Sequence, residues 1–183
     1  MTLIPLQYAL LGLLARAPQS GYELIQHMEE PVAFFWHAGR GQIYPELERL
    51  EVLGLISHTV VEQHHRPNKR VYSLTSAGLA ELRAWAGKTM DVPPDRDEFM
   101  LKVYSLWTVD PAEATTVINA YAQAHSQRLE QYRDIEAKML SNGDPVAEGA
   151  RSPRFAAYAT LQRGIEYEQG YVAWCRWLLE AIA

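Results

Sequence analysis

The segment from Gly39 to Pro45, GRGQIYP, combines residue types that recognise nucleic acid with a backbone that can approach it closely. Gln42 can hydrogen-bond an adenine edge, Arg40 a phosphate or a guanine, and Tyr44 a phosphate or a thymine methyl group. The glycines on either side of Arg40 permit close approach, and the N-terminus of the helix that follows favours phosphate. We therefore expect this segment to lie against DNA.

The same residues open a helix whose two faces differ. The helix is expected to end at Gly54, which provides a C-cap. Because proline fits only the first turn of a helix, Pro45 predicts a start at Gly41 or Gln42. Apolar side chains at helical spacing predict the inner face, Ile43, Leu47, Leu50 and Leu53. The outer face is left with Arg40, Gln42, Tyr44, Pro45, Glu48 and, further along, Arg49.

This helix is the third of a recognisable series. The elements predicted around it are helices at 3–16, 20–30, 41–54 and from 76 onward, and strands at 55–63 and 70–75. Ser20 and Glu23 supply a capping box for the second helix. Three helices and a two-stranded hairpin, the wing, form the winged helix-turn-helix plan, in which the third helix enters the DNA major groove.

The net charge of −5 argues against nucleic acid only when the chain is taken as a whole. Residues 1–90 carry equal numbers of acidic and basic side chains, so the acidity belongs to the second half. Residues 63–75, the predicted turn and second strand, contain no acid but carry Arg66, Lys69 and Arg70. A local basic surface of this kind suits contacts with DNA phosphates.

Composition and motifs exclude several classes of protein. Apolar residues make up 48% of the chain, which is the balance of a globular protein. The single cysteine, Cys175, allows no internal disulfide and suits a reducing cytoplasm. The apolar run at 8–15 is too short to span a membrane. His64 and His65 lack further ligands at suitable spacing, so we expect no metal. No motif for a cofactor or for catalysis is found, so we expect no enzyme.

The second half of the chain is predicted to be all helical. Residues 91–98, DVPPDRDE, indicate a linker between a DNA-binding domain at 1–90 and a second domain at 99–183. The helices expected there are 99–108, 112–140, capped by Asp110-Pro111, and 154–182. Two long helices with apolar stripes leave more apolar surface than one copy covers. We therefore expect a homodimer whose two reading helices lie about 34–36 Å apart on DNA.

Three segments of the first half resemble the PadR family of bacterial transcriptional regulators: LQYALLGLLARAPQSGYEL, FFWHAGRGQIYPELERLEVLGLI and RPNKRVYSLTSAGLAELRAW. The match runs in order through residues 3–87. The second half resembles, more loosely, the helical dimerisation domain of the longer PadR-type members. The resemblance implies a homodimer that represses transcription at a palindromic operator. It also implies that a small molecule, often a phenolic acid, binds between the two domains and releases the DNA.

The resemblance extends the set of expected site residues, since Tyr22 and the basic residues of the wing match positions that contact DNA in the family. The full set of expected DNA contacts is Ser20, Tyr22, Arg40, Gln42, Tyr44, Pro45, Arg49, Arg66, Lys69 and Arg70. For a planar phenolic carboxylate we expect aromatic side chains with a few polar groups, arginine meeting the carboxylate. The expected effector contacts are Trp36, His37, Tyr104, Trp107, Arg128 and Arg163.

A second function remains open from the sequence, that of a winged-helix adaptor that binds a protein and not DNA. The two functions differ at the face around Gln42 and Tyr44 and in the wing. Replacing Tyr44 and Arg66 by alanine is expected to abolish DNA binding but to leave the partner binding of an adaptor intact.

Overall fold

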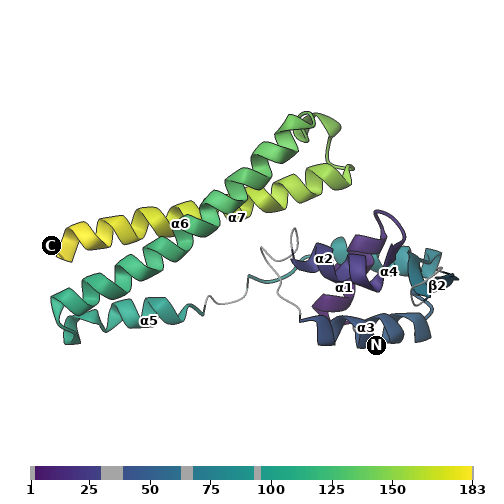
Figure 1. The fold of residues 1–183 in the computed structure, drawn as a ribbon, viewed down its shortest axis with the longest axis horizontal. Coiled ribbons are helices and arrows are strands. Elements are labelled where there is room, and N and C mark those ends of the chain that lie inside the picture. The colour runs from purple at the N-terminus through teal and green to yellow at the C-terminus, as the bar shows by residue number, and fades with distance from the viewer. Residues whose placement is uncertain (1–2, 30–38, 63–67, 93–95, 183) are drawn as a thin grey trace. The chain divides into compact units, whose positions relative to one another are not determined.

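The computed structural model describes residues 3–29, 39–62, 68–92 and 96–182 and divides the chain into two compact units, Met1–Met90 and Asp91–Ala183 (Figure 1). The first unit is a winged helix-turn-helix and the second is helical, so the predicted fold class is confirmed. The helices of the first unit are α1 (Pro5–Leu14), α2 (Gly21–Glu29), α3 (Arg40–Val52) and α4 (Ser76–Ala86). Its strands are β1 (Gln19–Ser20), β2 (Ile56–Val61) and β3 (Lys69–Leu74).

The sheet contains one strand more than the expected two-stranded hairpin. β2 and β3 pair antiparallel as expected, and β1 joins the other edge of β3, so the order is β1-β3-β2. Gln19 lies opposite Tyr72, and Ser20 lies opposite Val71. A strand of two residues is too short to show an alternating pattern, which is why the sequence did not indicate it. The pairing ties the start of α2 to the wing.

The inner face of α3 forms part of the core of the first unit. Ile43, Leu47 and Leu50 are fully buried, as their spacing predicted, and they pack with buried leucines of α1 and α2. The prediction for Leu53 was wrong, because this side chain is 39% exposed. α3 ends one residue earlier, and the chain turns away through Gly54, whose φ of 68° is readily adopted by glycine.

The predicted start of α3 was also wrong. The helix begins at Arg40 with Gly39 as its N-cap, so Pro45 is its sixth residue and lies beyond the first turn. The side-chain oxygen Oε1 of Gln42 accepts a hydrogen bond from the Gly39 N–H at 3.1 Å, and this cap sets the start. Pro45 removes the one bond that its N–H would make to the carbonyl of residue 41, and the buried face of the helix outweighs that loss.

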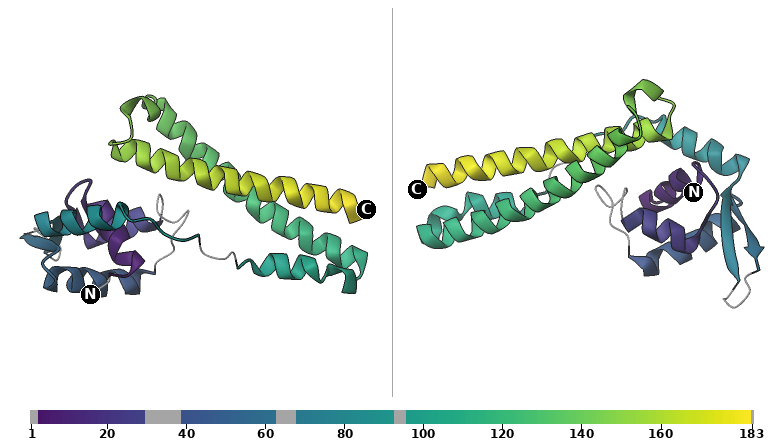
Figure 2. Two further views of the ribbon diagram at one scale, coloured as in Figure 1. Left: turned by 180° about the vertical axis from the view of Figure 1, so that it is seen from behind. Right: turned by 45° about the horizontal axis from the view of Figure 1, so that its top comes forward.

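The second unit consists of α5 (Glu98–Tyr104), η1 (Leu106–Thr108), α6 (Pro111–Ser141), η2 (Val146–Glu148) and α7 (Pro153–Ile182). α6 and α7 form a long antiparallel pair, which both views of Figure 2 show. Asp110 accepts a hydrogen bond from the Ala112 N–H at 2.9 Å, so the predicted cap of α6 is confirmed. The single helix expected at 99–108 is instead α5 followed by the 3₁₀ turn η1, with a break at Ser105.

One buried apolar cluster of the second unit contains Phe99, Ile118 and Cys175, and the Phe99 ring stacks on Tyr121. Ala114, Tyr132, Leu161 and Ile165 are also buried in this unit. Among the helices of the described residues, none combines the length and apolar character needed to cross a membrane.

The packing of α4 allows a direct test of the first unit. Thr75 Oγ1 donates to the Leu55 carbonyl oxygen at 3.0 Å and accepts from the Gly78 N–H at 3.0 Å. A Cβ added at Gly78 would lie 2.0 Å from that same carbonyl oxygen. We predict that Gly78→Ala lowers the free energy of unfolding by about 3 kcal/mol or more, since rigid backbone must move. Urea unfolding followed by circular dichroism measures the change.

Gly12 provides the matched control within α1, because a Cβ added there meets nothing within 4 Å. Gly12→Ala is expected to leave stability unchanged or to raise it by up to about 1 kcal/mol, since alanine favours the helix. Equal effects of the two substitutions would contradict the packing described for Gly78.

Candidate nucleic-acid interface

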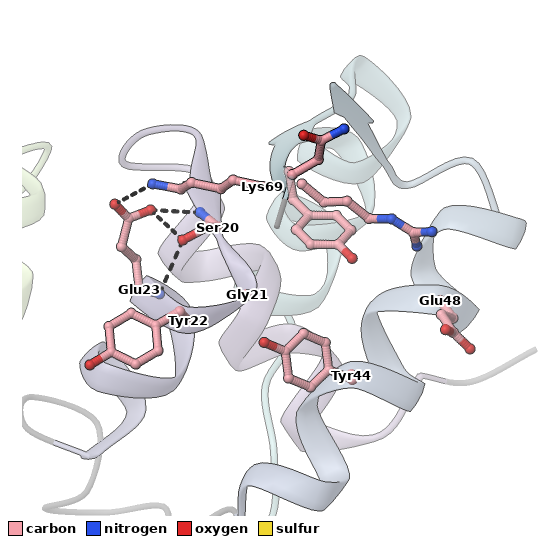
Figure 3. Close-up of a pocket in the computed structure, with 10 residues that line it drawn as sticks. Ser20, Gly21, Tyr22, Glu23, Tyr44, Glu48 and Lys69 are labelled. Atoms are coloured by element: carbon pink, nitrogen blue, oxygen red, sulfur yellow. Dashed lines mark hydrogen bonds and ion pairs between the residues drawn. The ribbon is translucent and has the colours of Figure 1, made fainter. Parts of the chain in front are cut away.

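A hollow of about 550 Å³ lies where the N-terminus of α2, the exposed face of α3 and strand β3 meet (Figure 3). We call it the α2–α3 hollow. Its lining residues are Ser20, Gly21, Tyr22, Glu23, Tyr44, Glu48, Asn68, Lys69, Arg70 and Tyr72. Five of the expected DNA contacts, from three separate parts of the sequence, therefore line one surface: Ser20, Tyr22, Tyr44, Lys69 and Arg70.

Gly21 leaves room for the Tyr44 ring beside the start of α2. A Cβ at Gly21 would lie 2.6 Å from Cε1 of that ring, so a larger residue would require the ring to shift. The tyrosine ring lies beside the first turn of α2 and stays 48% exposed toward the hollow. Tyr44 can therefore present its hydroxyl to a ligand while its ring packs on the protein. The role of Gly21 was not predicted from the sequence, because its only signal there is a glycine directly after a helix cap.

The capping box predicted for α2 is confirmed. Both the backbone N–H and the hydroxyl of Ser20 donate to Glu23 Oε2 at 2.7 Å, and the Glu23 N–H donates to Ser20 Oγ at 3.3 Å. Ser20 is itself buried. Its hydroxyl is thus engaged in holding the helix start, which makes Ser20 a residue that positions the surface.

Lys69 extends this cap into the wing. Its Nζ lies 3.0 Å from Glu23 Oε1 and links β3 to α2 (Figure 3). The hydrogen bonds from the Ser20 backbone and hydroxyl, followed by that from Lys69, lower the pKa of Glu23 to about 2. The charge of Lys69 is therefore paired with the Glu23 carboxylate of the same chain. Arg70, one residue along, is exposed and forms no ion pair with any residue that the structure describes.

Two expected contacts on α3 have partners within the first unit. Gln42 caps its own helix through Oε1, and Arg49 pairs with Glu46. Glu46 is buried and also accepts a hydrogen bond from Gln7 Nε2 of α1 at 2.8 Å. This buried link between α1 and α3 orients the third helix. The sequence analysis missed it, although a polar residue inside the apolar pattern of each helix was a signal.

Several expected residues cannot be placed in this surface. Arg66 of the wing and the pair Trp36 and His37 lie outside the described residues, as do His64 and His65. Arg40 is the first residue of α3, and its side chain is not among the described side chains. Pro45 is exposed on α3. No group of three metal-ligating side chains occurs in the part of the chain that the structure describes.

The effector contacts expected in the second unit have different surroundings. Tyr104 and Trp107 are 84% and 85% exposed. The Arg163 guanidinium lies over the ring of Tyr167 at 5.6 Å. Arg128 Nη1 lies 3.3 Å from Glu168 Oε1, so a protein carboxylate already holds this arginine.

A buried polar pair next to Arg128 was missed by the sequence analysis. Glu168 on α7 and His125 on α6 are hydrogen-bonded to each other, and they are only 2% and 5% exposed. The His125 ring stacks on Tyr171 with centroids 4.4 Å apart. The available signal was the phase of Glu168, which falls on the same helix face as the buried Leu161 and Ile165. The pair joins the two long helices through a satisfied polar contact.

Comparisons with known families place these features in context. Residues 10–84 match the transcriptional regulator PadR-like family, and residues 96–183 match the virulence activator alpha C-terminal family. The chain is 33% identical over 178 residues to the negative transcriptional regulator PadR of Bacillus subtilis, covering 97% of each. It is 30% identical over 188 residues to a probable transcriptional regulator of Mycobacterium tuberculosis, again covering 97% of each.

Solved structures agree over nearly the whole chain. Bacillus subtilis PadR in complex with operator DNA superposes with a TM-score of 0.87 at 31% identity, covering 97% of this chain and 99% of that one. The same protein in complex with p-coumaric acid gives a TM-score of 0.81, covering 97% and 98%. The virulence activator AphA of Vibrio cholerae shares the fold, with a TM-score of 0.76 at 23% identity, covering 97% of each chain.

The cap around Glu23 yields a measurable titration. We predict a pKa of about 2 for the Glu23 carboxyl in the folded protein, read by an NMR titration of the side-chain carboxyl carbon. Because this pKa lies below the unfolded value, the group stabilises the fold above about pH 4.5, and that contribution is lost as the pH falls through 2. Lys69→Met should raise the pKa only part of the way, because the Ser20 hydrogen bonds contribute more than the lysine. A wild-type pKa between 4 and 5 would contradict the geometry.

Proposed function

The chain belongs to the PadR family of transcriptional regulators, and from this premise we propose that it is a dimeric repressor that binds operator DNA and responds to a small aromatic effector. The family is one of regulators and not of enzymes. The observation that carries the proposal is the α2–α3 hollow, where expected DNA contacts from α2, α3 and the wing lie together. A repressor that binds operator DNA would act in the cytoplasm.

The roles proposed in DNA binding differ among the residues of this surface. Tyr22 and Tyr44 are exposed at the start of α2 and on α3, so their hydroxyls can reach phosphate or base edges. Arg70, which pairs with none of the described residues, supplies a positive charge for phosphate. Ser20 and Lys69 hold the surface in shape through Glu23. The structural match to a PadR protein solved with operator DNA supports this arrangement over that of a protein adaptor.

A homodimer formed through the second unit is part of the proposal. Large apolar side chains are exposed there on α5, η1 and α7, and they include Leu101, Tyr104, Trp107 and Trp177. Exposed apolar groups of this size are uncommon on a monomer and typical of an interface between subunits. The first units of the two subunits, related by a twofold axis, would then bind the two halves of an inverted-repeat operator.

The effector proposed is a small aromatic carboxylate of the phenolic acid type. It is supported by the likeness to a PadR protein in complex with p-coumaric acid and by aromatic hollows in the second unit. One hollow of about 380 Å³ is lined by Met100, Glu166, Tyr167, Gly170, Tyr171 and Trp174. Arg163 is not part of this lining, but its guanidinium lies over the ring of Tyr167. An arginine beside aromatic rings suits a planar carboxylate. Trp36 and His37 remain proposed contacts.

We predict tight, salt-sensitive binding to DNA from upstream of the protein's own coding region, with two copies of the protein per operator. Each phosphate contact contributes about 0.9 to the slope of log K against log salt, so Arg70→Gln should weaken binding and reduce that slope by about 1. Tyr44→Phe keeps the ring against Gly21 but removes the hydroxyl, so it should weaken binding several-fold. Fluorescence anisotropy over a salt series measures both effects.

Arg83→Gln is the charge-matched control, because Arg83 is exposed on α4 and does not line the hollow. It should leave the salt slope unchanged. The absence of DNA binding even at low salt would reject the repressor and favour the adaptor.

We predict that one member of a panel of hydroxycinnamates and benzoates weakens operator binding at least tenfold. The effector must bind the DNA-free arrangement more tightly than the DNA-bound one, because only differential affinity shifts the equilibrium. Arg163→Met should reduce the response to that compound while leaving operator affinity without it unchanged. If every compound is without effect, the repressor stands and the phenolic effector is rejected.

A further inference from the structure

The three carboxylates of α3 have different surroundings. Glu46 is buried and bound by Gln7 and Arg49. Glu51 accepts a hydrogen bond from His58 Nδ1 of β2 at 2.6 Å. Glu48 is exposed and forms no hydrogen bond or ion pair with any residue that the structure describes. It is thus the one acidic side chain of this helix that is available to a ligand.

Glu48 also lies on the face that the other expected DNA contacts share. It follows Tyr44 by four residues, which places the two side chains one helical turn apart on the same face. Both line the α2–α3 hollow together with Arg70 of the wing (Figure 3). If α3 enters the major groove as proposed, the Glu48 carboxylate faces base edges and backbone phosphates.

The charge of Glu48 restricts what it can contact on DNA. A carboxylate only accepts hydrogen bonds, so phosphate oxygens repel it. In the major groove, guanine presents two acceptors and thymine presents one acceptor and a methyl group. Adenine offers a donor at N6, but its acceptor N7 stands beside that donor and repels a carboxylate. Cytosine presents the N4 amino group as a donor with no acceptor of its own beside it.

We propose that Glu48 is a specificity-determining residue that accepts a hydrogen bond from the N4 amino group of a cytosine in each operator half-site. This inference rests on the proposed function, since it requires α3 to lie in the major groove. Glu48 contributes little to affinity for DNA in general, because its charge opposes phosphate. It contributes to the choice among sequences, because the three other bases leave the carboxylate facing an acceptor.

The test compares base preferences of the intact protein and its variants by selection from a random duplex library, followed by affinity measurements on the selected sites. Glu48→Gln keeps the size of the side chain but adds a donor, and an amide pairs with N6 and N7 of adenine. Glu48→Ala removes the contact altogether. Glu51→Gln is the matched control, because it removes the same charge from the same helix while its amide oxygen can still accept from His58.

The wild-type protein is expected to select one cytosine per half-site with a preference of about ten- to a hundredfold, the range that one good base contact supplies. Glu48→Gln should shift that position toward adenine, Glu48→Ala should lose the preference, and Glu51→Gln should retain it. Replacing the selected cytosine by 2-pyrimidinone, which lacks the amino group, should lower the affinity of the wild-type protein for the site. It should leave the affinity of Glu48→Ala unchanged.

Two results would overturn the inference, and they are distinguishable. If Glu48→Gln and Glu51→Gln tighten binding to every sequence alike, Glu48 acts only through repulsion of phosphate, and the repressor function stands. If the wild-type protein selects no sequence from the library, the proposed function fails and the role of Glu48 fails with it.

Discussion

The close approach of α2 and α3 at Gly21 is the contact on which the surface of the first unit depends. Because residue 21 has no side chain, the ring of Tyr44 lies against the first turn of α2, and a hollow opens beside it toward the wing. The short strand β1 ends directly before Gly21 and pairs with β3, so the same point also anchors the wing. This glycine, the β1–β3 pairing and the Glu23–Lys69 ion pair thus meet at the start of α2.

Polar contacts fix the relative orientation of α1, α2, α3 and β3, which apolar packing alone would leave variable. Lys69 reaches Glu23 across the hollow, and Gln7 reaches the buried Glu46 between α1 and α3. The Gln7–Glu46 contact is buried and directional, so it orients helices that hydrophobic packing only brings together. A consequence is that fewer basic residues are free for DNA than the charge count suggests. The overall acidity of the chain is compatible with DNA binding because the proposed DNA-binding surface carries its own balance of charge.

The second unit is held together by the packing of two long helices, α6 and α7. These two helices of about 30 residues pack along their length, and the buried polar pair His125–Glu168 joins them. The His125 ring of this pair lies against the rings of Tyr121, Tyr167 and Tyr171. The remaining apolar surface of the unit includes tryptophans and tyrosines that are well suited both to a subunit interface and to an aromatic ligand. The exposure of Tyr104 and Trp107 in a single copy fits the interface better than a pocket within one chain.

The sequence by itself determined the order of the long helices and of strands β2 and β3, the capping box of α2, the cap of α6 and the buried stripe Ile43, Leu47 and Leu50. Each of these depends on local hydrogen bonding or on periodicity, which neighbouring residues carry. Only the tertiary structure decided which polar residues remain exposed and which are engaged within the protein. Ser20, Gln42, Lys69 and Arg49 have partners there, while Glu48 has none among the described residues. The close contact at Gly21 and the pair His125–Glu168 join residues distant in sequence, so spacing alone could not predict them.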